Sequence, residues 1–107
     1  MTTIPKIARI WRGRTRREIA DQYEGYMRAE GVPPLERTAL GVQLFRENRE
    51  HETWFTTTSY WADVEAMSAF TKGEPTKVHH LPRDAELLME LPERIEIHAI
   101  LIDKREL

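Results

Sequence analysis

The spacing of apolar residues changes period along this chain, and the order of these changes limits the folds that it can adopt. Apolar residues alternate over 4–12, 38–47, 52–61 and 93–103. Between the first two of these segments, and again over 63–71, they recur at helical spacing. A period of two is typical of strands, and a period near 3.6 is typical of helices. The order β-α-β-β-α-β predicts an α+β, ferredoxin-like arrangement, in which two main helices cover one face of an antiparallel four-stranded sheet.

Capping and breaking residues indicate where the first helix begins and ends. Thr15 and Glu18 have the spacing of a capping box, in which a hydroxyl and a carboxylate satisfy the first free amides of a helix. Gly31 suits the left-handed position at a helix end, and Pro33–Pro34 opposes any continuation. The first helix is therefore expected to lie between these two signals.

Polar and helix-breaking residues separate the remaining elements. Asn48–His51 is a polar turn, so the second and third strands are expected to form an antiparallel hairpin. Gly73 is expected to end the second helix, and Pro82–Leu91 predicts a short further helix that begins at its proline. No linker, repeat or low-complexity segment interrupts this order, so residues 1–107 are expected to form a single domain.

Composition excludes several classes of function. The 107 residues contain no cysteine, which rules out disulfides, thiolate nucleophiles and cysteine-ligated zinc or iron–sulfur sites. The net charge of −2 predicts no general attraction to nucleic acid or to anionic membranes. The first residues contain no apolar signal core, and no run of about 18 apolar residues occurs. We expect a soluble cytoplasmic protein with neither a nucleic-acid nor a membrane partner.

Both faces of the predicted sheet carry apolar residues. The last strand sets Ile95 and Ile97 against Ile100 and Ile102. Two helices can cover only one face, and a sheet with one wet face should alternate cleanly between apolar and polar residues. Because a large apolar face is unfavourable in water, we expect a two-fold homodimer with the sheets face to face.

Several short motifs occur at particular points of these predicted elements. They are Ile7–Arg14 on the first strand, Ser59–Trp61 at the end of the third strand and Ala66–Phe70 on the second helix. Single residues that accompany them are Tyr23, Gly41, His80, Pro82, Asp84 and Leu87. Together these residues resemble the antibiotic biosynthesis monooxygenase-like proteins, over roughly residues 7–102.

The resemblance implies a dimeric α/β barrel and more than one chemistry. Some members of this family resemble cofactor-free monooxygenases of polycyclic aromatic substrates, and others degrade haem. Haem-degrading members use an Asn on the first strand, a Trp near the end of the second main helix and a later His. In this chain Ile7 or Ala8 lies near the Asn position, Phe70 takes that of the Trp, and His80 takes that of the His. Trp61 matches a family tryptophan that packs at the junction of strand and helix.

Three residues are candidates for catalysis. The imidazole of His80 can act as a base near neutral pH, or alternatively face solvent in a loop. Arg9 and Tyr60 carry polar groups that can stabilise a developing oxyanion. Apolar and aromatic residues suited to a flat ligand pocket, each of which also fits an ordinary place in a core, are Trp11, Trp61, Phe70, Met67 and Tyr23.

The arginines between Arg9 and Arg17 form the only dense positive cluster in the sequence. They indicate either an anionic ligand nearby or a solvated edge balanced by Glu18, Asp21 and Glu24.

Three functional hypotheses follow from these residues. The first is a homodimeric monooxygenase that oxidises an aromatic or polyketide-like substrate with O₂, in a pocket between sheet and helices, without cofactor or metal. The second is a protein that binds or degrades haem through His80. The third is a non-catalytic module that binds a small apolar or aromatic ligand.

Overall fold

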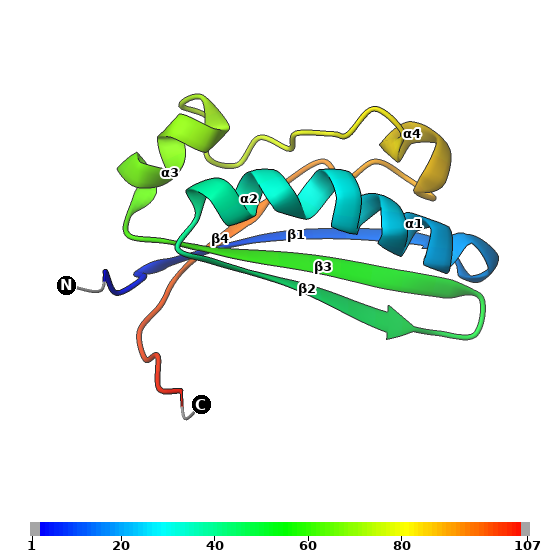
Figure 1. The fold of residues 1–107 in the computed structure, drawn as a ribbon, viewed down its shortest axis with the longest axis horizontal. Helices are drawn as coiled ribbons and strands as arrows, with labels where there is room; N and C mark the ends of the chain where they lie inside the picture. The colour runs from blue at the N-terminus through cyan, green and yellow to red at the C-terminus, as the bar shows by residue number, and fades with distance from the viewer. Residues whose placement is uncertain (1–2, 106–107) are drawn as a thin grey trace.

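A four-stranded antiparallel sheet carries every helix on one of its faces in the computed structural model, which describes residues 3–105 (Figure 1). The strands follow the order β2-β3-β1-β4 across the sheet. This arrangement confirms the expected α+β, ferredoxin-like fold. The strands are β1 (Ile7–Arg16), β2 (Gly41–Asn48), β3 (Glu52–Trp61) and β4 (Glu96–Ala99).

The helical layer contains four α-helices and two other helical turns. The short helix α4 and the loop before it lie beside the layer that α1 and α2 form above the sheet (Figure 1). The elements are η1 (Arg17–Ile19), α1 (Ala20–Tyr26), η2 (Met27–Gly31), α2 (Val32–Thr38), α3 (Val64–Thr71) and α4 (Asp84–Leu87).

The first helical segment continues through the residues that were expected to end it. The turn η2 is a π-helix that joins α1 directly to α2, and Pro33–Pro34 lies at the start of α2. The N–H of Val32 donates to the carbonyl of Met27, which is the wider hydrogen-bond spacing of a π turn. A proline in the first turn of a helix removes a donor that has no required partner there. The predicted helix end at Gly31 was therefore wrong.

The predicted capping box was also wrong, because its first residue, Thr15, belongs to a strand and pairs with another strand. Thr15 belongs to β1, where it is fully buried opposite Thr53 of β3. The strand continues to Arg16, whose side chain makes no capping hydrogen bond to η1. Ten residues of β1 pair with β3, and this long ladder outweighs the local capping signal.

In the second half of the chain, the start of α3 agrees with the sequence pattern, whereas the helix expected over Pro82–Leu91 spans only Asp84–Leu87. The helix α3 begins after Asp63, whose carboxylate accepts a hydrogen bond of 2.7 Å from the N–H of Ala66. It ends at Lys72, which adopts a left-handed conformation with φ of 55°. The strand β4 is shorter than predicted, so Ile100 and Ile102 lie beyond its end.

Strand alternation divides the sheet into an inner face under the helices and an outer face. Trp11 and Phe55 point inward and pack with Tyr23 in the main core. The Trp11 ring lies over Gly13, where a Cβ atom would come within 2.6 Å of the ring. Glycine at this position therefore leaves the space that the Trp11 side chain occupies.

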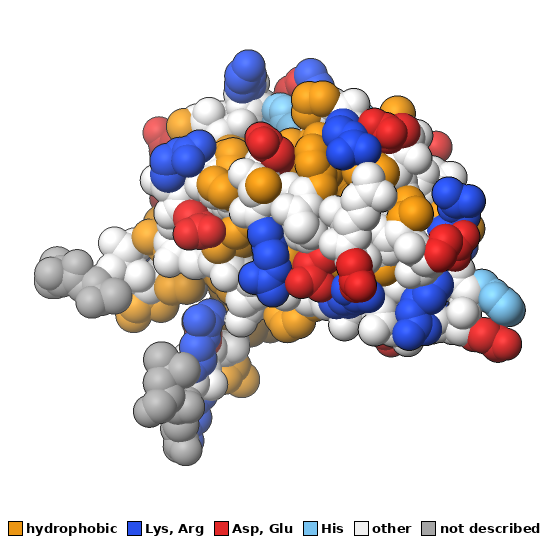
Figure 2. All heavy atoms as spheres, turned by 45° about the vertical axis from the view of Figure 1, so that its right-hand side comes forward, with side chains coloured by type: hydrophobic (Ala, Val, Ile, Leu, Met, Phe, Trp, Pro, Cys, Tyr) orange, Lys and Arg blue, Asp and Glu red, His pale blue; other side chains and the backbone are white. Residues whose placement is uncertain are grey.

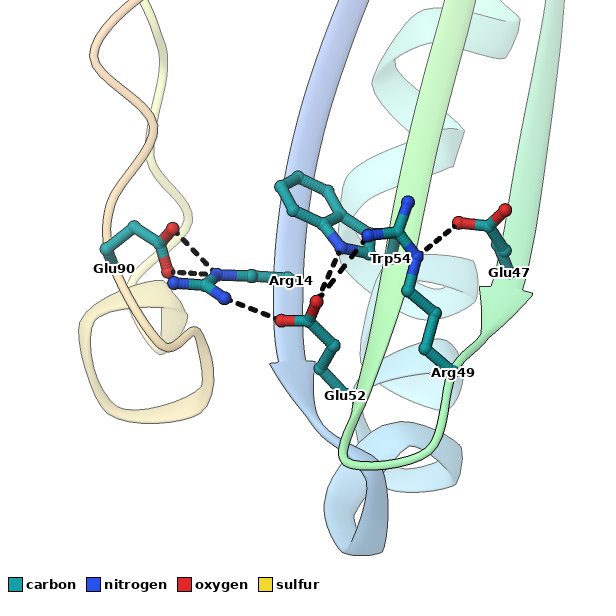
Figure 3. A network of polar contacts seen from close by, with 6 residues as sticks. All are labelled: Arg14, Glu47, Arg49, Glu52, Trp54 and Glu90. Carbon is teal, nitrogen blue, oxygen red and sulfur yellow. Dashed lines mark hydrogen bonds and ion pairs between the residues drawn. The ribbon is translucent and has the colours of Figure 1, made fainter.

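Ion pairs and aromatic side chains share the outer face (Figure 3). The Arg14 guanidinium contacts Glu52 at 2.6 Å and Glu90 at 2.8 Å. Arg14 and Arg49 also lie over the ring of Trp54, with their Cζ atoms 5.8 and 5.4 Å from its centroid. The outer face is thus mixed in character, and ion pairs accompany the apolar residues that the strand pattern placed on both faces.

The arginine cluster of the first strand divides between the two faces. Arg12, Arg14 and Arg16 point away from the helices, and each contacts a carboxylate. Arg17 is exposed. Of the expected balancing partners, Glu18 pairs with Arg16, whereas Asp21 and Glu24 both pair with Arg46 of β2 instead. Arg9 of the same cluster points inward, under the helices.

Charges of both signs are interspersed over the side of the molecule that Figure 2 shows, in keeping with the small net charge. Within residues 3–105, no helix has the length and apolar character needed to cross a bilayer.

We predict opposite effects from two glycine-to-alanine substitutions. Gly13→Ala should lower the free energy of unfolding by about 1–3 kcal/mol, because the new methyl group meets the Trp11 ring. Gly25 lies in α1, and no atom lies within 4 Å of the position that its Cβ would take. Gly25→Ala should therefore raise the free energy of unfolding by about 0.5–1 kcal/mol. Urea denaturation measures both, and equal effects would contradict the tight contact described for Gly13.

Candidate functional site

A cavity of about 270 Å³ lies between the inner face of the sheet and the helical layer. This volume is near the lower end of the range of about 300–1,000 Å³ for small-molecule pockets. It therefore suits a small fused-ring aromatic molecule. Lining residues with aromatic or polar side chains include Arg9, Trp11, Thr57, Phe70, His79 and His80.

Three separate parts of the chain bring these side chains together. Alternation along β1 turns Arg9 and Trp11 inward, and Thr57 of β3 lies opposite Trp11 in the register of the sheet. Phe70 comes from the last turn of α3. The loop that follows α3 supplies the histidines, which close the side of the cavity away from the sheet.

Arg9 is a buried cation without a counter-ion. Its side chain is 5 % exposed, and no carboxylate of the described residues lies within ion-pair distance of it. Its Nη2 donates to the carbonyl of Lys77 at 3.2 Å, whereas its Nε is buried with no hydrogen-bond partner. The Cζ atom lies 5.2 Å from the centroid of the Phe70 ring. Burial lowers the pKa of Arg9 to about 10, so the group stays positively charged at neutral pH.

The two adjacent histidines have different surroundings. The His79 ring packs edge-on against Phe70, with 5.8 Å between the ring centroids. Burial, and then the positive charges of Arg9 and two lysines, lower the pKa of His79, which favours its neutral form. Both histidines line the cavity, and both are exposed. The sequence pattern favoured His80, and only the contact with Phe70 distinguishes His79.

Four of the predicted site residues converge on this cavity, namely Arg9, Trp11, Phe70 and His80. Trp61 and Met67 lie behind Phe70 in a second core cluster. The Trp61 ring is 5.7 Å from that of Phe70, and its Nε1 donates to the hydroxyl of Ser59 at 2.9 Å. These two residues support the cavity without lining it.

Tyr60 lies on the opposite face of the sheet, so it cannot act in this cavity as the sequence analysis proposed. The neighbouring residues Ser59 and Trp61 are buried on the inner face, and strand alternation therefore turns Tyr60 outward. Its hydroxyl donates to Gln43 at 2.6 Å, and the guanidinium of Arg105 lies over its ring.

Tyr23 lies in the core and anchors the loop that carries the histidines. Its hydroxyl donates to Oδ1 of Asp84 at 3.0 Å, and Oδ2 of Asp84 accepts from the N–H of Leu81 at 2.9 Å. Burial, followed by the negative charge of Asp84, raises the pKa of Tyr23, so the phenol is neutral. Asp84 and Tyr23 were both among the residues of the family resemblance, but the sequence pattern did not indicate this buried contact between them.

Metal-ligating side chains do not gather in the described part of the chain. Among residues 3–105, no three histidine or acidic side chains lie close enough together to hold a metal ion.

The fold and its inward-facing cavity define a class of structure that solved proteins of low sequence identity share. A Bacillus cereus protein provisionally named an antibiotic biosynthesis monooxygenase has the same fold, with a TM-score of 0.67 and 10 % sequence identity. The match covers 96 % of this chain and 100 % of that protein. A Nitrosomonas europaea protein of unknown function matches with a TM-score of 0.64 and 19 % identity, over 98 % of both chains. No protein-family profile matches the chain, and no curated protein matches it in sequence.

We predict that Tyr23→Phe destabilises the protein by about 1–3 kcal/mol, because the buried Asp84 oxygen loses its donor. Urea denaturation measures this change. The matched control is Tyr26→Phe, which removes a hydroxyl that accepts from the exposed N–H of Arg83 and should change stability by less than about 0.5 kcal/mol. Equal losses in the two variants would show that the Tyr23–Asp84 contact does not anchor the loop.

Proposed function

We propose that the protein is a small monooxygenase-like enzyme that oxidises an aromatic or polyketide-like substrate with O₂ and needs no resident cofactor. The observation that carries this proposal is the aromatic-lined cavity containing Arg9, a buried guanidinium without a counter-ion. A cation held in a site of low polarity stabilises a substrate that has lost a proton. The fold shared with the Bacillus cereus protein supports the same chemistry.

The proposed reaction balances without an external reductant. A methylene group between two aromatic systems loses a proton to give a delocalised anion, which transfers electrons to O₂. The carbon gives up two hydrogens and four electrons and gains one oxygen atom as a carbonyl. The second oxygen atom leaves as water, so R₂CH₂ and O₂ give R₂CO and H₂O.

Residues of this chain have distinct proposed roles in that reaction. Arg9 binds the negatively charged form of the substrate. His79, whose neutral form is favoured, accepts the proton and, because it is exposed, passes the proton to solvent. His80, which lines the same cavity, is the alternative base. Trp11 and Phe70 hold the rings of the substrate and exclude water.

The residues fit a haem-degrading site poorly. His80 lines the cavity, but Phe70 replaces the tryptophan of such sites, and Ile7 and Ala8 bring no amide to the first strand. The volume of about 270 Å³ also suits a smaller molecule than a tetrapyrrole. Haem degradation through His80 is therefore the weaker alternative.

We predict O₂-dependent turnover of a reduced polycyclic aromatic by the protein as purified, with and without a metal chelator. Oxygen uptake and product absorbance under aerobic and anaerobic conditions measure it. Arg9→Met should lower kcat/KM by about 10²–10³-fold, as does removal of an oxyanion donor. Arg12→Met, which alters the same strand on its outer face, should leave kcat/KM within about twofold of that of the unmodified protein.

A panel of such substrates without oxygen uptake above background would contradict the enzymatic proposal. A Soret shift on addition of haemin that His80→Ala abolishes would instead support the haem alternative.

A non-catalytic ligand-binding module is the second candidate function. The position of Tyr60 favours it. Because this residue lies on the outer face of the sheet, the cavity has one polar group fewer that could take part in catalysis. Tight binding of an aromatic ligand without oxygen uptake would distinguish this module from the enzyme.

The protein is further proposed to act as a homodimer through the outer faces of its two sheets. Phe45 of β2 projects from this face with 50 % of its surface exposed, and exposed apolar residues continue at Leu101 and Ile102. A second copy would cover these side chains and pair with the charges of the same face.

We predict that Phe45→Glu weakens dimerisation at least tenfold, because it places unpaired charge in an apolar contact. Sedimentation velocity across micromolar concentrations measures the association. Val64→Glu, which changes an exposed apolar residue on the helical side, is the control and should leave the dimer intact. A monomeric unmodified protein would contradict this arrangement.

A further inference from the structure

We infer that the cavity binds an aromatic carboxylate, whose carboxylate group is held by Arg9 and Thr57. Aromatic carboxylates would then be the substrate class of the proposed enzyme. Binding of the carboxylate does not depend on the proposed function, whereas its role as a substrate does. Two buried polar groups at one cavity carry the inference. Four buried side-chain atoms of the described residues have no hydrogen-bond partner. Two of them, Nε of Arg9 and Oγ1 of Thr57, belong to residues that line this cavity, whereas the hydroxyls of Thr15 and Thr71 do not. Because buried groups without a partner are uncommon in folded proteins, two such residues at one cavity point to a ligand that supplies the partner.

The missing partner must accept hydrogen bonds and carry negative charge. A guanidinium has donors and no acceptor, and a hydroxyl can donate to the same ligand group. The protein supplies Arg9 with one backbone carbonyl and an aromatic face, and with no carboxylate among the described residues. A buried cation is unfavourable unless it is paired, so an anionic ligand has a large advantage over a neutral one.

Acidic side chains near the cavity do not fill this role. Both oxygens of Asp84 are already hydrogen-bonded, one to Tyr23 and one to the N–H of Leu81. Glu30 lines the cavity from an exposed position on the π turn and makes no ion pair with Arg9. The positive charge of Arg9 therefore remains available to a ligand.

The register of the sheet places the donors beside an aromatic surface. Trp11 lies opposite Thr57 in the β1–β3 ladder, and Arg9 is the next inward-facing residue along β1. Phe70 borders the other side of the Arg9 guanidinium. A carboxylate attached directly to an aromatic ring matches this order, since its head reaches the donors while its ring contacts the aromatic side chains.

Lys72 adds a second positive charge to the cavity lining. It stands at the end of α3 in a left-handed conformation, with its side chain exposed. An exposed cation at the mouth of an apolar cavity attracts anions from solution, so association should weaken as salt is added.

Isothermal titration calorimetry with three matched probes tests the inference. The probes are 2-naphthoate, the neutral 2-naphthalenemethanol and inorganic phosphate, all at one ionic strength. We expect 2-naphthoate to bind at least tenfold more tightly than the alcohol, because only the acid neutralises Arg9. Phosphate alone should bind weakly, because it lacks the ring that contacts Trp11 and Phe70.

Variants of the two donors separate their contributions. Arg9→Met should weaken 2-naphthoate binding by roughly tenfold to a hundredfold and leave the alcohol within about threefold. Thr57→Val should weaken 2-naphthoate binding by roughly twofold to tenfold. Arg12→Met removes an arginine of the same strand from the outer face and should change neither affinity.

Thermal unfolding adds a readout that distinguishes ligand binding from a structural role of Arg9. Removal of an unpaired buried cation should leave the ligand-free Arg9→Met protein at least as stable as the unmodified one. A clear fall in its melting temperature would show that Arg9 serves the fold, and would count against the inference.

Equal affinity for the acid and the alcohol, or an acid affinity that neither Arg9→Met nor Thr57→Val lowers, would overturn the inference. Oxygen uptake with neutral aromatics and no carboxylate preference would remove the inference and leave the proposed enzyme standing. Selective 2-naphthoate binding without oxygen uptake by any aromatic acid would remove the enzyme and leave the carboxylate site.

Discussion

The structure depends on the continuous pairing of β1 with β3. Ten residues of each strand lie in one antiparallel register, from Ile7 opposite Trp61 to Arg16 opposite Glu52. A shift of one residue would turn every side chain of β1 to the other face of the sheet. The guanidinium of Arg9 would then lie in solvent, and that of Arg12 would lie under the helices. This single register therefore sets both the packed core and the charge inside the cavity.

Local sequence patterns predicted the bounds of an element correctly where residues within that element determine where it begins and ends. The bounds of β3 and the start of α3 agree with the pattern, since strong alternation and the Asp63 cap act over a few residues. The pattern failed at Thr15 and Gly31 for different reasons. Pairing with a distant strand extended β1 past the capping signal, and a π turn carried the helix past the glycine. The residues adjacent to Thr15 and Gly31 in the sequence indicate neither the strand pairing nor the π turn.

The candidate site shows the same division between local and distant information. Alternation along β3 turns Tyr60 and Trp61 to opposite faces of the sheet. The register with β1 then places Arg9 and Trp11 on the face of Trp61, and this register could not be read from the sequence. The sequence did not show that Arg9, unlike the other arginines of β1, is buried without a counter-ion. A count of charges along a strand does not tell on which face of the sheet each residue lies. The pairing of Asp84 with Tyr23 links residues far apart in the sequence, and no pattern in the sequence reports it.

The π turn between α1 and α2 has a consequence for the evolution of the cavity. One residue inserted into a regular α-helix rotates everything after it by about 100°. The wide turn at Met27–Gly31 accommodates an extra residue locally, so Leu35 still meets the core. Met27 and Gly31 line the cavity, and a Cβ atom on Gly31 would come within 2.8 Å of the Met27 sulfur. Changes in main-chain length at this point can therefore reshape the cavity while the helices on either side keep their packing.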